Sequence, residues 1–189
     1  MAWTFLLEDG TGLAASNSYA SVAQGDDYHL SRLRSTVWTG AVTGDKEKAL
    51  AQASRLIDAE MRFRGYKASD AQAMQWPRIL ARDRNLYGAL VTPNSAGATF
   101  NEYFNATTIP KELREATCEL ARLLLGGERT DPEDTDGTGI KSLAIYKGVS
   151  VEFNGADRKK ALPSVVVNML AGLGTPISGG IGQATLVRK

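Results

Sequence analysis

The sequence predicts a mainly α protein, a small helical bundle that also carries a β-hairpin, a short N-terminal strand, a long loop and an extended C-terminal arm. Apolar residues recur at helical spacing in the segments 43–61 and 110–125, whereas apolar and polar residues alternate over 149–153. The chain has 189 residues, 43% of them apolar, which is enough for one hydrophobic core. We therefore expect a helical domain over residues 1–174 and an arm over residues 175–189.

The first two helices are predicted from the residues at their N-termini. Ser21 and Gln24 have the spacing of a capping box, so we expect a helix from Ser21 to about Arg32, weakened by Gly25. Thr43 is expected to cap the second helix. The side of this helix that faces the core is expected to consist of Ala49, Leu50, Ala53, Leu56, Ile57 and Met61.

The middle of the chain predicts a short helix followed by a long loop. Ser69 and Gln72 repeat the capping-box spacing, and the helix is expected to end at Trp76 because Pro77 disfavours helical backbone in the residue before it. The segment 79–108 is rich in Gly, Asn, Pro and Thr, which predicts a long loop with at most one short helix.

A central helix is predicted after this loop. Ile109-Pro110 marks its start and Gly126-Gly127 its end. Two adjacent apolar stripes leave few residues for contact with water, so the helix is expected to be central. The residues expected to face water are Lys111, Glu112, Glu115, Glu119 and Arg122.

The remaining elements are two β structures and one more helix. Lys147-Gly148 separates two apolar stretches, which predicts a hairpin over 140–153 with one half-buried face. Residues 2–7 predict a short strand that ends in the turn at residues 9–12. Pro163 predicts the start of the last helix.

Composition limits the classes of function. Twenty-two Lys and Arg against 21 Asp and Glu leave a formal charge of +1, which disfavours strong non-specific binding of nucleic acid. One cysteine and one histidine provide neither a disulfide framework nor a metal-ligand set. The N-terminus lacks the features of a secretory signal, and no apolar run approaches the roughly 20 residues that span a bilayer. We expect a soluble protein of a reducing compartment, without cofactor, metal or membrane partner.

The residue types that most often carry catalysis have no catalytic setting in this sequence. His29 has no nucleophile motif nearby, which favours a packing or surface role. Cys118 lies at helical spacing from apolar residues, which favours a buried and inert thiol. The glycine-containing segments 9–12 and 179–182 lack the Lys and Ser/Thr of a phosphate loop, and we interpret them as a turn and a flexible tail. The sequence predicts no catalytic residue and no enzyme.

Basic residues alternate with aromatic ones in the segment 62–67. One interpretation is a surface that stacks on and neutralises a single DNA strand. The favoured interpretation is that Phe63 and Trp76 anchor the core, while the neighbouring arginines face water or pair with acidic residues. Trp76, Pro77 and Arg78 are accordingly expected to form a structural corner, with Arg78 paired to Asp58 or Glu60.

Short motifs over most of the stretch from Leu7 to Leu170 together resemble a known family. In chain order they are Glu8-Asp9-Gly10-Thr11-Gly12, Asn17-Ser18-Tyr19, Ala23 to His29, Leu56-Ile57-Asp58, Arg62-Phe63-Arg64-Gly65, Gln75-Trp76-Pro77-Arg78, Ile109-Pro110, Ala116 to Ala121, Ile140-Lys141-Ser142 and Val149 to Phe153. The chain resembles the small helical head-to-tail connector, or adaptor, proteins of tailed phages, which often carry the label DnaT-like single-stranded-DNA-binding protein. The segment 82–107 and the extension after Leu173 depart from the family pattern.

The resemblance implies a structural virion protein without catalytic activity. Family members form a ring, expected to be dodecameric, beneath the portal protein, and the genome passes through its channel. The implied partners are the portal protein, neighbouring copies of the chain, a stopper, tail or tail-nozzle protein below the ring, and DNA in transit without specific binding. The implied location is the head–tail interface of the virion, after synthesis in the host cytoplasm. The label also implies an alternative, a module that binds single-stranded DNA, which the charge balance does not support.

Two segments are candidate contact sites of such a ring. The acidic loop, with Glu128, Asp131, Glu133, Asp134 and Asp136, is expected to line the channel and repel phosphates. The arm is expected to bind the portal protein, because apolar residues in a Gly-rich segment need a partner surface to become ordered. Its contact residues are expected to be Thr175, Pro176, Ile177, Ile181, Leu186, Val187, Arg188 and Lys189. The alternative is an untethered terminus.

Overall fold

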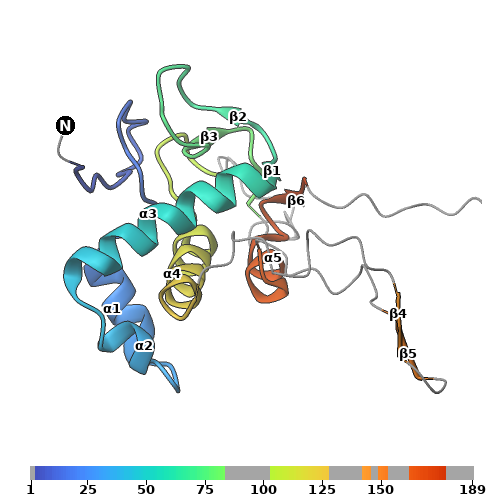
Figure 1. Ribbon diagram of the computed structural model, residues 1–189. Coiled ribbons are helices and arrows are strands. Elements are labelled where there is room, and N and C mark those ends of the chain that lie inside the picture. The colour runs from blue at the N-terminus through green and yellow to red at the C-terminus, as the bar shows by residue number, and fades with distance from the viewer. Residues whose placement is uncertain (1–2, 84–102, 128–141, 146–148, 153–161, 178–189) are drawn as a thin grey trace, which may run out of the picture.

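The computed structural model describes residues 3–83, 103–127, 142–145, 149–152 and 162–177, and it confirms a mainly helical fold (Figure 1). The helices are α1 (Val22–Leu30), α2 (Thr36–Thr39), α3 (Thr43–Glu60), α4 (Lys111–Leu125) and α5 (Ser164–Leu170). The strands of these residues form three antiparallel pairs, β1 (Met61–Phe63) with β6 (Gly174–Pro176), β2 (Tyr66–Lys67) with β3 (Arg78–Ile79) and β4 (Ser142–Ile145) with β5 (Val149–Glu152). No helix in the described ranges is long and apolar enough to cross a bilayer.

Helix α4 lies at the centre of the body and packs against α1, α2, α3 and α5, which confirms the predicted central helix. Its residues Leu113, Ala116 and Leu120 are fully buried. Thr117 is also buried, and its hydroxyl donates to the carbonyl oxygen of Leu113 at 2.8 Å, so the polar group is satisfied within the helix. Glu119 was expected to face water, and this expectation is wrong because Glu119 is buried.

The helix starts agree with the sequence in one case and differ in another. Ser21 and Gln24 form the predicted capping box at α1, and the helix ends at Leu30 rather than at Arg32. Helix α3 begins at Thr43, but Thr43 does not cap it, because Val42 occupies the N-cap position and no side chain bonds the first turn there. Helix α3 is therefore stabilised by its buried apolar face rather than by a side-chain cap.

Helix α2, which the sequence analysis did not predict, places Trp38 in the core against α1. The Trp38 ring is fully buried, lies 4.9 Å from the His29 ring, and donates its Nε1–H to Asp26 Oδ1 at 2.8 Å. A Cβ atom on Gly25 would lie only 2.4 Å from the Trp38 ring. Gly25 lowers the helix propensity of α1, but it provides the space that the indole occupies.

The N-terminal segment is extended but does not form the predicted strand. Leu7 and Ser18 form a single parallel bridge, and the Glu8 N–H donates to the Ser18 carbonyl oxygen at 2.8 Å. The Asn17 side chain accepts from Leu6 N–H and donates to the Thr4 carbonyl oxygen. The backbone bonds from Glu8 and Asn17, together with the Asn17 side chain, therefore hold the segment against residues 17–18 without a regular strand pair.

The predicted helix over residues 69–76 is wrong. These residues form turns, in which Ser69 N–H donates to Gln72 Oε1 at 2.9 Å. The Gln72 amide nitrogen donates to the carbonyl oxygens of Met74 (2.8 Å) and Pro77 (3.1 Å). Ser69 and Gln72 thus make one of the two bonds of a capping box, whereas the Ser69 hydroxyl accepts from the Ala71 N–H, and Gln72 closes a loop around the proline instead of starting a helix.

The start of the expected arm belongs to the body. Strand β6 pairs with β1 in the register Met61 opposite Pro176 and Phe63 opposite Gly174. The Ile177 N–H donates to the Glu60 carbonyl oxygen at 2.7 Å, so it satisfies a carbonyl at the end of α3. Residues 178–189 lie outside the described part of the chain.

The predicted hairpin is confirmed in its backbone, with Ser142 opposite Glu152 and Ile145 opposite Val149. The side chains of its expected half-buried face lie outside the described ones. The two ends of the long loop meet where Arg82 and Tyr103 form an antiparallel bridge, and residues 84–102 between them are not described. Helix α5 begins directly after Pro163, as predicted.

Gly25→Ala is expected to lower the free energy of unfolding by roughly 1–3 kcal/mol, because the new Cβ would overlap the buried Trp38 ring. Gly44→Ala is the matched control, because Gly44 also lies in a helix but has no atom near the position of a Cβ. It should stabilise by a few tenths to about 1 kcal/mol, the usual gain in helix propensity. Chemical denaturation of both variants measures the difference, and equal stabilisation by both would contradict the packing of Trp38 on Gly25.

Candidate functional site

Trp76 and Pro77 form a corner in the core, joined by a cis peptide bond. The Trp76 ring is fully buried, and it contacts the rings of Phe63 and Phe104 edge-on, at centroid distances of 5.9 and 5.6 Å. Such edge-on pairs are favourable aromatic contacts. Phe63 is also buried, so neither Phe63 nor Trp76 presents a ring face on which a nucleotide base can stack.

Arg78 does not pair with Asp58 or Glu60, which corrects the expected ion pair. Its guanidinium donates to backbone carbonyl oxygens instead, at 2.8 Å to Arg64, 2.6 Å to Gly65 and 3.0 Å to Gln75. Burial lowers the pKa of Arg78 from its ordinary value, but an arginine side chain stays charged in a protein. The side chain therefore fastens two loop segments through their carbonyl groups.

Tyr19, which is fully buried, and Asp58, which is largely shielded from solvent, form a polar pair at the same corner. The Tyr19 hydroxyl donates to Asp58 Oδ1 and accepts from the Trp76 N–H at 3.2 Å. Asp58 Oδ2 accepts from the Gln75 N–H at 3.0 Å. The two side chains thus satisfy backbone N–H groups that the irregular turn leaves without partners in regular secondary structure. They connect the segment before α1, the end of α3 and the corner.

Burial shifts the titration of this pair. It raises the pKa of Asp58 to about 6, although the hydrogen bonds from Tyr19 and Gln75 oppose this shift. Burial, followed by the charge of Asp58, raises the pKa of Tyr19 well above its ordinary value. The tyrosine is therefore a proton donor in the pair at neutral pH, and Asp58 is the group that titrates.

The segment Asp9-Gly10-Thr11-Gly12 wraps around the carboxylate of Glu8. Glu8 is buried, and its two oxygens accept four hydrogen bonds at 2.8–3.0 Å, from the backbone N–H groups of Gly10, Gly12 and Leu13 and from the Ser16 hydroxyl. Converging N–H groups of this kind commonly bind anions. Here the anion is part of the chain, so these donors are not available to a phosphate group.

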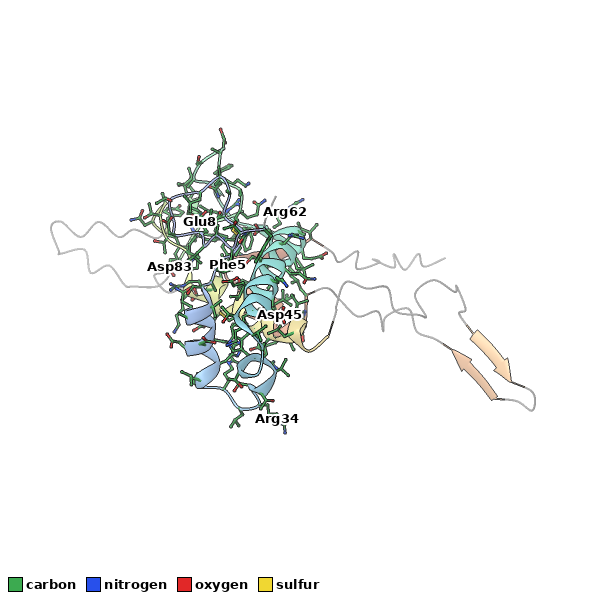
Figure 2. All side chains as sticks on the ribbon, turned by 60° about the vertical axis from the view of Figure 1, so that its left-hand side comes forward. Phe5, Glu8, Arg34, Asp45, Arg62 and Asp83 are labelled. Atoms are coloured by element: carbon green, nitrogen blue, oxygen red, sulfur yellow. The ribbon has the colours of Figure 1, made fainter. Side chains whose placement is uncertain are left out.

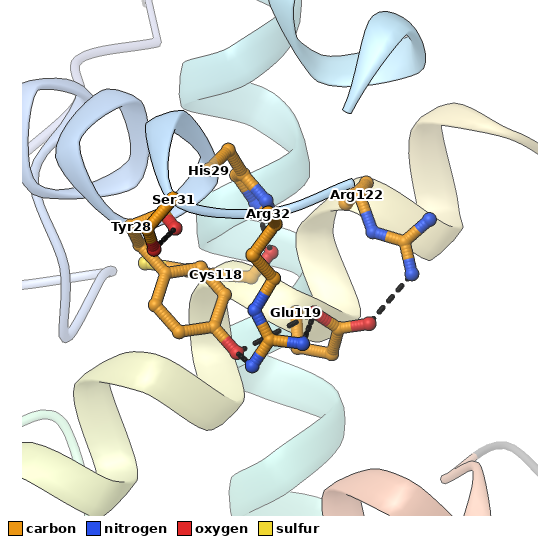
Figure 3. Close-up of polar contacts among 7 residues, drawn as sticks. All are labelled: Tyr28, His29, Ser31, Arg32, Cys118, Glu119 and Arg122. Carbon is orange, nitrogen blue, oxygen red and sulfur yellow. Dashed lines mark hydrogen bonds and ion pairs between the residues drawn. The ribbon is translucent and has the colours of Figure 1, made fainter. Parts of the chain in front are cut away.

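A second buried carboxylate joins α1 to α4 (Figure 3). Glu119 lies 2.6 Å from the Arg122 guanidinium and 3.4 Å from that of Arg32. Arg32 also stacks over the Tyr28 ring, 4.4 Å from its centroid, and donates to the Tyr28 hydroxyl. The guanidinium groups of Arg32 and Arg122 and the Tyr28 hydroxyl compensate the charge of Glu119, so this acidic residue can lie on the buried side of α4.

His29 and Cys118 lie side by side without forming a nucleophile. The His29 Nε2 is 3.2 Å from the backbone carbonyl oxygen of Cys118, not from its sulfur. Burial raises the pKa of the Cys118 thiol to about 12 and lowers that of His29. A thiol that stays protonated is a poor nucleophile. His29 and Cys118 instead contribute to the packing of α1 against α4.

The exposed part of the basic and aromatic segment is small. Arg62 and Arg64 lie on the surface, and the Tyr66 side chain is 67% exposed. Figure 2 shows Arg62 well apart from Arg34, which lies at the lower end of the body. Tyr66 is the one exposed aromatic side chain of the segment 62–67. A single strand could therefore stack only on Tyr66, which lies between basic residues.

Several predicted site residues lie outside the described part of the chain. They are all the acidic-loop residues, Glu128, Asp131, Glu133, Asp134 and Asp136, and the arm residues Ile181, Leu186, Val187, Arg188 and Lys189. Thr175, Pro176 and Ile177 are described, and all three are exposed. In the ranges the structure describes, no cluster of three His, Cys, Asp or Glu residues could hold a metal ion.

The roles of Glu8, Tyr19 and Glu119 were not predicted from the sequence. Glu8 carried a usable signal, since an acidic residue two positions before the first of two closely spaced glycines can fill the nest of N–H groups that they form. Glu119 carried another, because it stands between the apolar residues Cys118 and Leu120 in the central helix. The pairing of Tyr19 with Asp58 joins residues 39 positions apart and had no local signal.

Residues 3–189 match a protein family described as "Putative DnaT-like ssDNA binding protein". The match covers nearly the whole chain, and the chain therefore belongs to this family. No curated protein and no solved structure matches the chain.

Glu8→Gln is expected to lower the free energy of unfolding by about 2–3 kcal/mol, because it removes the charge and turns an amide nitrogen towards donors in a buried site. Asp9→Asn is the matched control, because Asp9 is exposed and a single oxygen accepts both of its bonds from Thr11. That variant should leave the stability close to that of the parent, because the side chain is solvated. Equal effects in urea denaturation would contradict a structural role for the Glu8 carboxylate.

The stability of the protein should depend on the protonation of Asp58. Its folded pKa of about 6 lies above the ordinary value of about 3.9, so the folded state binds the proton more tightly and gains stability as the pH falls through 6. Between pH 7.5 and pH 5 the parent should gain about 1 kcal/mol more than Asp58→Asn.

Urea denaturation at both pH values measures this gain. Asp27→Asn, an exposed site, is measured at the same two pH values and controls for the change in net charge. An Asp58→Asn variant with the same pH dependence as the parent would contradict the account of the buried pair.

Proposed function

We propose that this chain is a structural virion protein, a head-to-tail adaptor that forms a ring under the portal and links it to the next neck or tail component. The observation that supports this proposal best is that residues of the family motifs have structural roles in the body of the protein. Glu8, Tyr19, Asp58, Trp76 and Arg78 all hold the body together through buried contacts. A motif set used for the scaffold suits a protein whose function is to keep its shape within an assembly.

The surroundings of the chain follow from this proposal. It would lie at the head–tail interface of the virion, in contact with the portal protein, with copies of itself and with a stopper, tail or tail-nozzle protein, while DNA passes through the channel. The acidic loop at residues 128–136 would face this channel and repel the phosphates, so that the genome can slide. No catalytic step is required of the chain.

Attachment to the portal is assigned to residues 178–189. Thr175 and Pro176 are paired with β1, and Ile177 bonds the end of α3, so these residues are needed for the body itself. Ile181, Leu186 and Val187 supply apolar contacts, and Arg188 and Lys189 supply charge. Ordering such a segment costs about 1–2 kcal/mol per residue, so one arm binds weakly and a ring of arms binds together.

Deleting residues 178–189 is expected to leave the melting temperature unchanged and to abolish co-sedimentation with portal rings, because the deletion spares β6 and the Ile177 bond. A deletion from Thr175 is the contrasting variant, and it should lower the melting temperature through loss of the β1–β6 pair. Full portal binding by the chain that ends at Ile177 would contradict the role of the arm.

Binding of single-stranded DNA is the second candidate, and one observation favours it. Arg62, Arg64 and Tyr66 are all exposed within five residues, a combination that can contact a strand through phosphate and base. The net charge of +1 argues against strong binding.

The adaptor proposal predicts oligonucleotide binding no tighter than about 1 μM at physiological salt, the non-specific range. Fluorescence anisotropy with a labelled oligonucleotide measures it. Tighter binding whose affinity decreases in the Tyr66→Ala variant, but not in the Tyr103→Ala variant, would favour the second candidate.

A further inference from the structure

His29 is a fully buried ionisable side chain at the contact of α1 with α2 and α4 (Figure 3). Its ring lies 4.9 Å from the Trp38 ring of α2 and 5.0 Å from the Tyr28 ring. Histidine is the residue whose charge changes closest to neutral pH. The contact between these helices therefore contains a group that responds to acid.

The two nitrogen atoms of the His29 ring have different surroundings. Nε2 lies 3.2 Å from the backbone carbonyl oxygen of Cys118. A carbonyl oxygen only accepts hydrogen bonds, so Nε2 carries the proton of the neutral ring and Nδ1 carries the free electron pair. Nδ1 is buried and has no hydrogen-bond partner among the described residues. A second proton on the closed structure would create a buried N–H group without an acceptor, which is costly.

The carboxylate nearest to His29 along α1 is bound to other donors. Asp26 Oδ1 accepts from the Trp38 Nε1–H at 2.8 Å and from Lys46 Nζ, on α3, at 2.7 Å. To accept from a protonated His29, Asp26 would have to give up one of these bonds. Helix α2 contributes no titratable residue to the contact.

The other titratable groups around the ring belong to α4 and to the end of α1. They are Cys118, Glu119, Arg122, Tyr28 and Arg32. The thiol and the phenol stay neutral, because burial raises the pKa of each to about 12. The two guanidinium groups repel an imidazolium ion, and the one carboxylate attracts it. Burial has the largest effect, and it lowers the pKa of His29 below its ordinary value of 6.5.

Helices α1 and α2 form one continuous segment, residues 22–39, which we call the α1–α2 unit. Its helices bury few residues, namely Gly25 and His29 in α1 and Trp38 in α2. The attachment of the unit therefore centres on the contact between His29 and Trp38. Segments with few buried side chains are the ones that open separately from the rest of a protein.

Opening of the α1–α2 unit leaves the buried carboxylate of α4 paired. Glu119 loses Arg32 but keeps the Arg122 guanidinium of its own helix, at 2.6 Å. Asp58, near the end of α3, responds to acid in the opposite direction, because burial raises its pKa to about 6 and the folded state gains stability when it is protonated. Acid thus weakens the contact at His29 and strengthens the corner, which favours local over global opening.

We propose that His29 is an acid-sensitive switch, which holds the α1–α2 unit on α4 while its ring is neutral and releases the unit when Nδ1 takes up a proton from solvent. Release breaks the bond from Nε2 to the Cys118 carbonyl oxygen and exposes the ring. The switch is built into the body of the chain, so it operates whether or not the chain binds a portal protein.

Hydrogen exchange of the full chain at pH 7.5 and pH 5, followed for single amides by NMR and corrected for intrinsic exchange rates, tests the switch. The open state binds the proton more tightly, so the opening constant of the α1 amides should rise roughly 5- to 30-fold at pH 5, at most about tenfold per pH unit below 6.5. Amides in the middle of α4 exchange through global opening and should change much less, because Asp58 opposes the effect.

His29→Gln removes the titration and keeps a side-chain N–H that can donate to the Cys118 carbonyl oxygen. It should abolish the acid-dependent rise at α1, whereas Asp58→Asn, the matched control, should retain it. An equal rise in His29→Gln, or no rise in the parent, would overturn the switch.

The imidazole signals of the parent provide a second readout that does not depend on any variant. The chain has one histidine, so a titration followed by NMR reports on His29 alone. The signal of the closed state should keep its neutral position as the pH falls through 6.5, while the signal of an open state grows in. A closed-state signal that titrates with a midpoint at or above 6.5 would show that the closed structure accepts the proton, and the proposal would be wrong.

Discussion

The body depends on satisfying the polar groups of an irregular backbone corner inside an apolar core. Trp76 and Pro77 turn the chain without regular secondary structure, so the peptide groups around them need other partners. Tyr19 and Asp58 accept from the N–H groups of the turn, and Arg78 donates to the carbonyl groups of the adjoining loop. These three polar side chains connect the N-terminal segment, α3 and the strands into one unit.

Local patterns were enough to predict the helices that bury a continuous stripe. Helix α4 and the capping box of α1 were found because each is determined by neighbours along the chain. The segment 69–76 was misassigned because Gln72 has the spacing of a helix cap but bonds a loop around Pro77. The Asp58 site and the β1–β6 pair join residues far apart in sequence, and no periodicity encodes such contacts.

The difference between local and long-range contacts also explains why sequence motifs identify residues of the scaffold more readily than residues of the surface. The buried carboxylates of Glu8 and Glu119 need hydrogen-bond or ion-pair partners, and some of these partners lie a few residues away along the chain. Such a carboxylate and its local partners form a short segment that can be recognised in the sequence. Membership of the family can therefore be recognised from the motifs of the scaffold.

Electron microscopy of the chain mixed with portal rings tests the central claim, the adaptor function, most directly. If the chain is an adaptor, a second ring of this chain is expected, coaxial with the portal ring and bound to one of its ends, with an open channel through both. Portal rings that remain bare at saturating concentrations of the folded chain, under conditions in which the same chain coats single-stranded DNA, would contradict it.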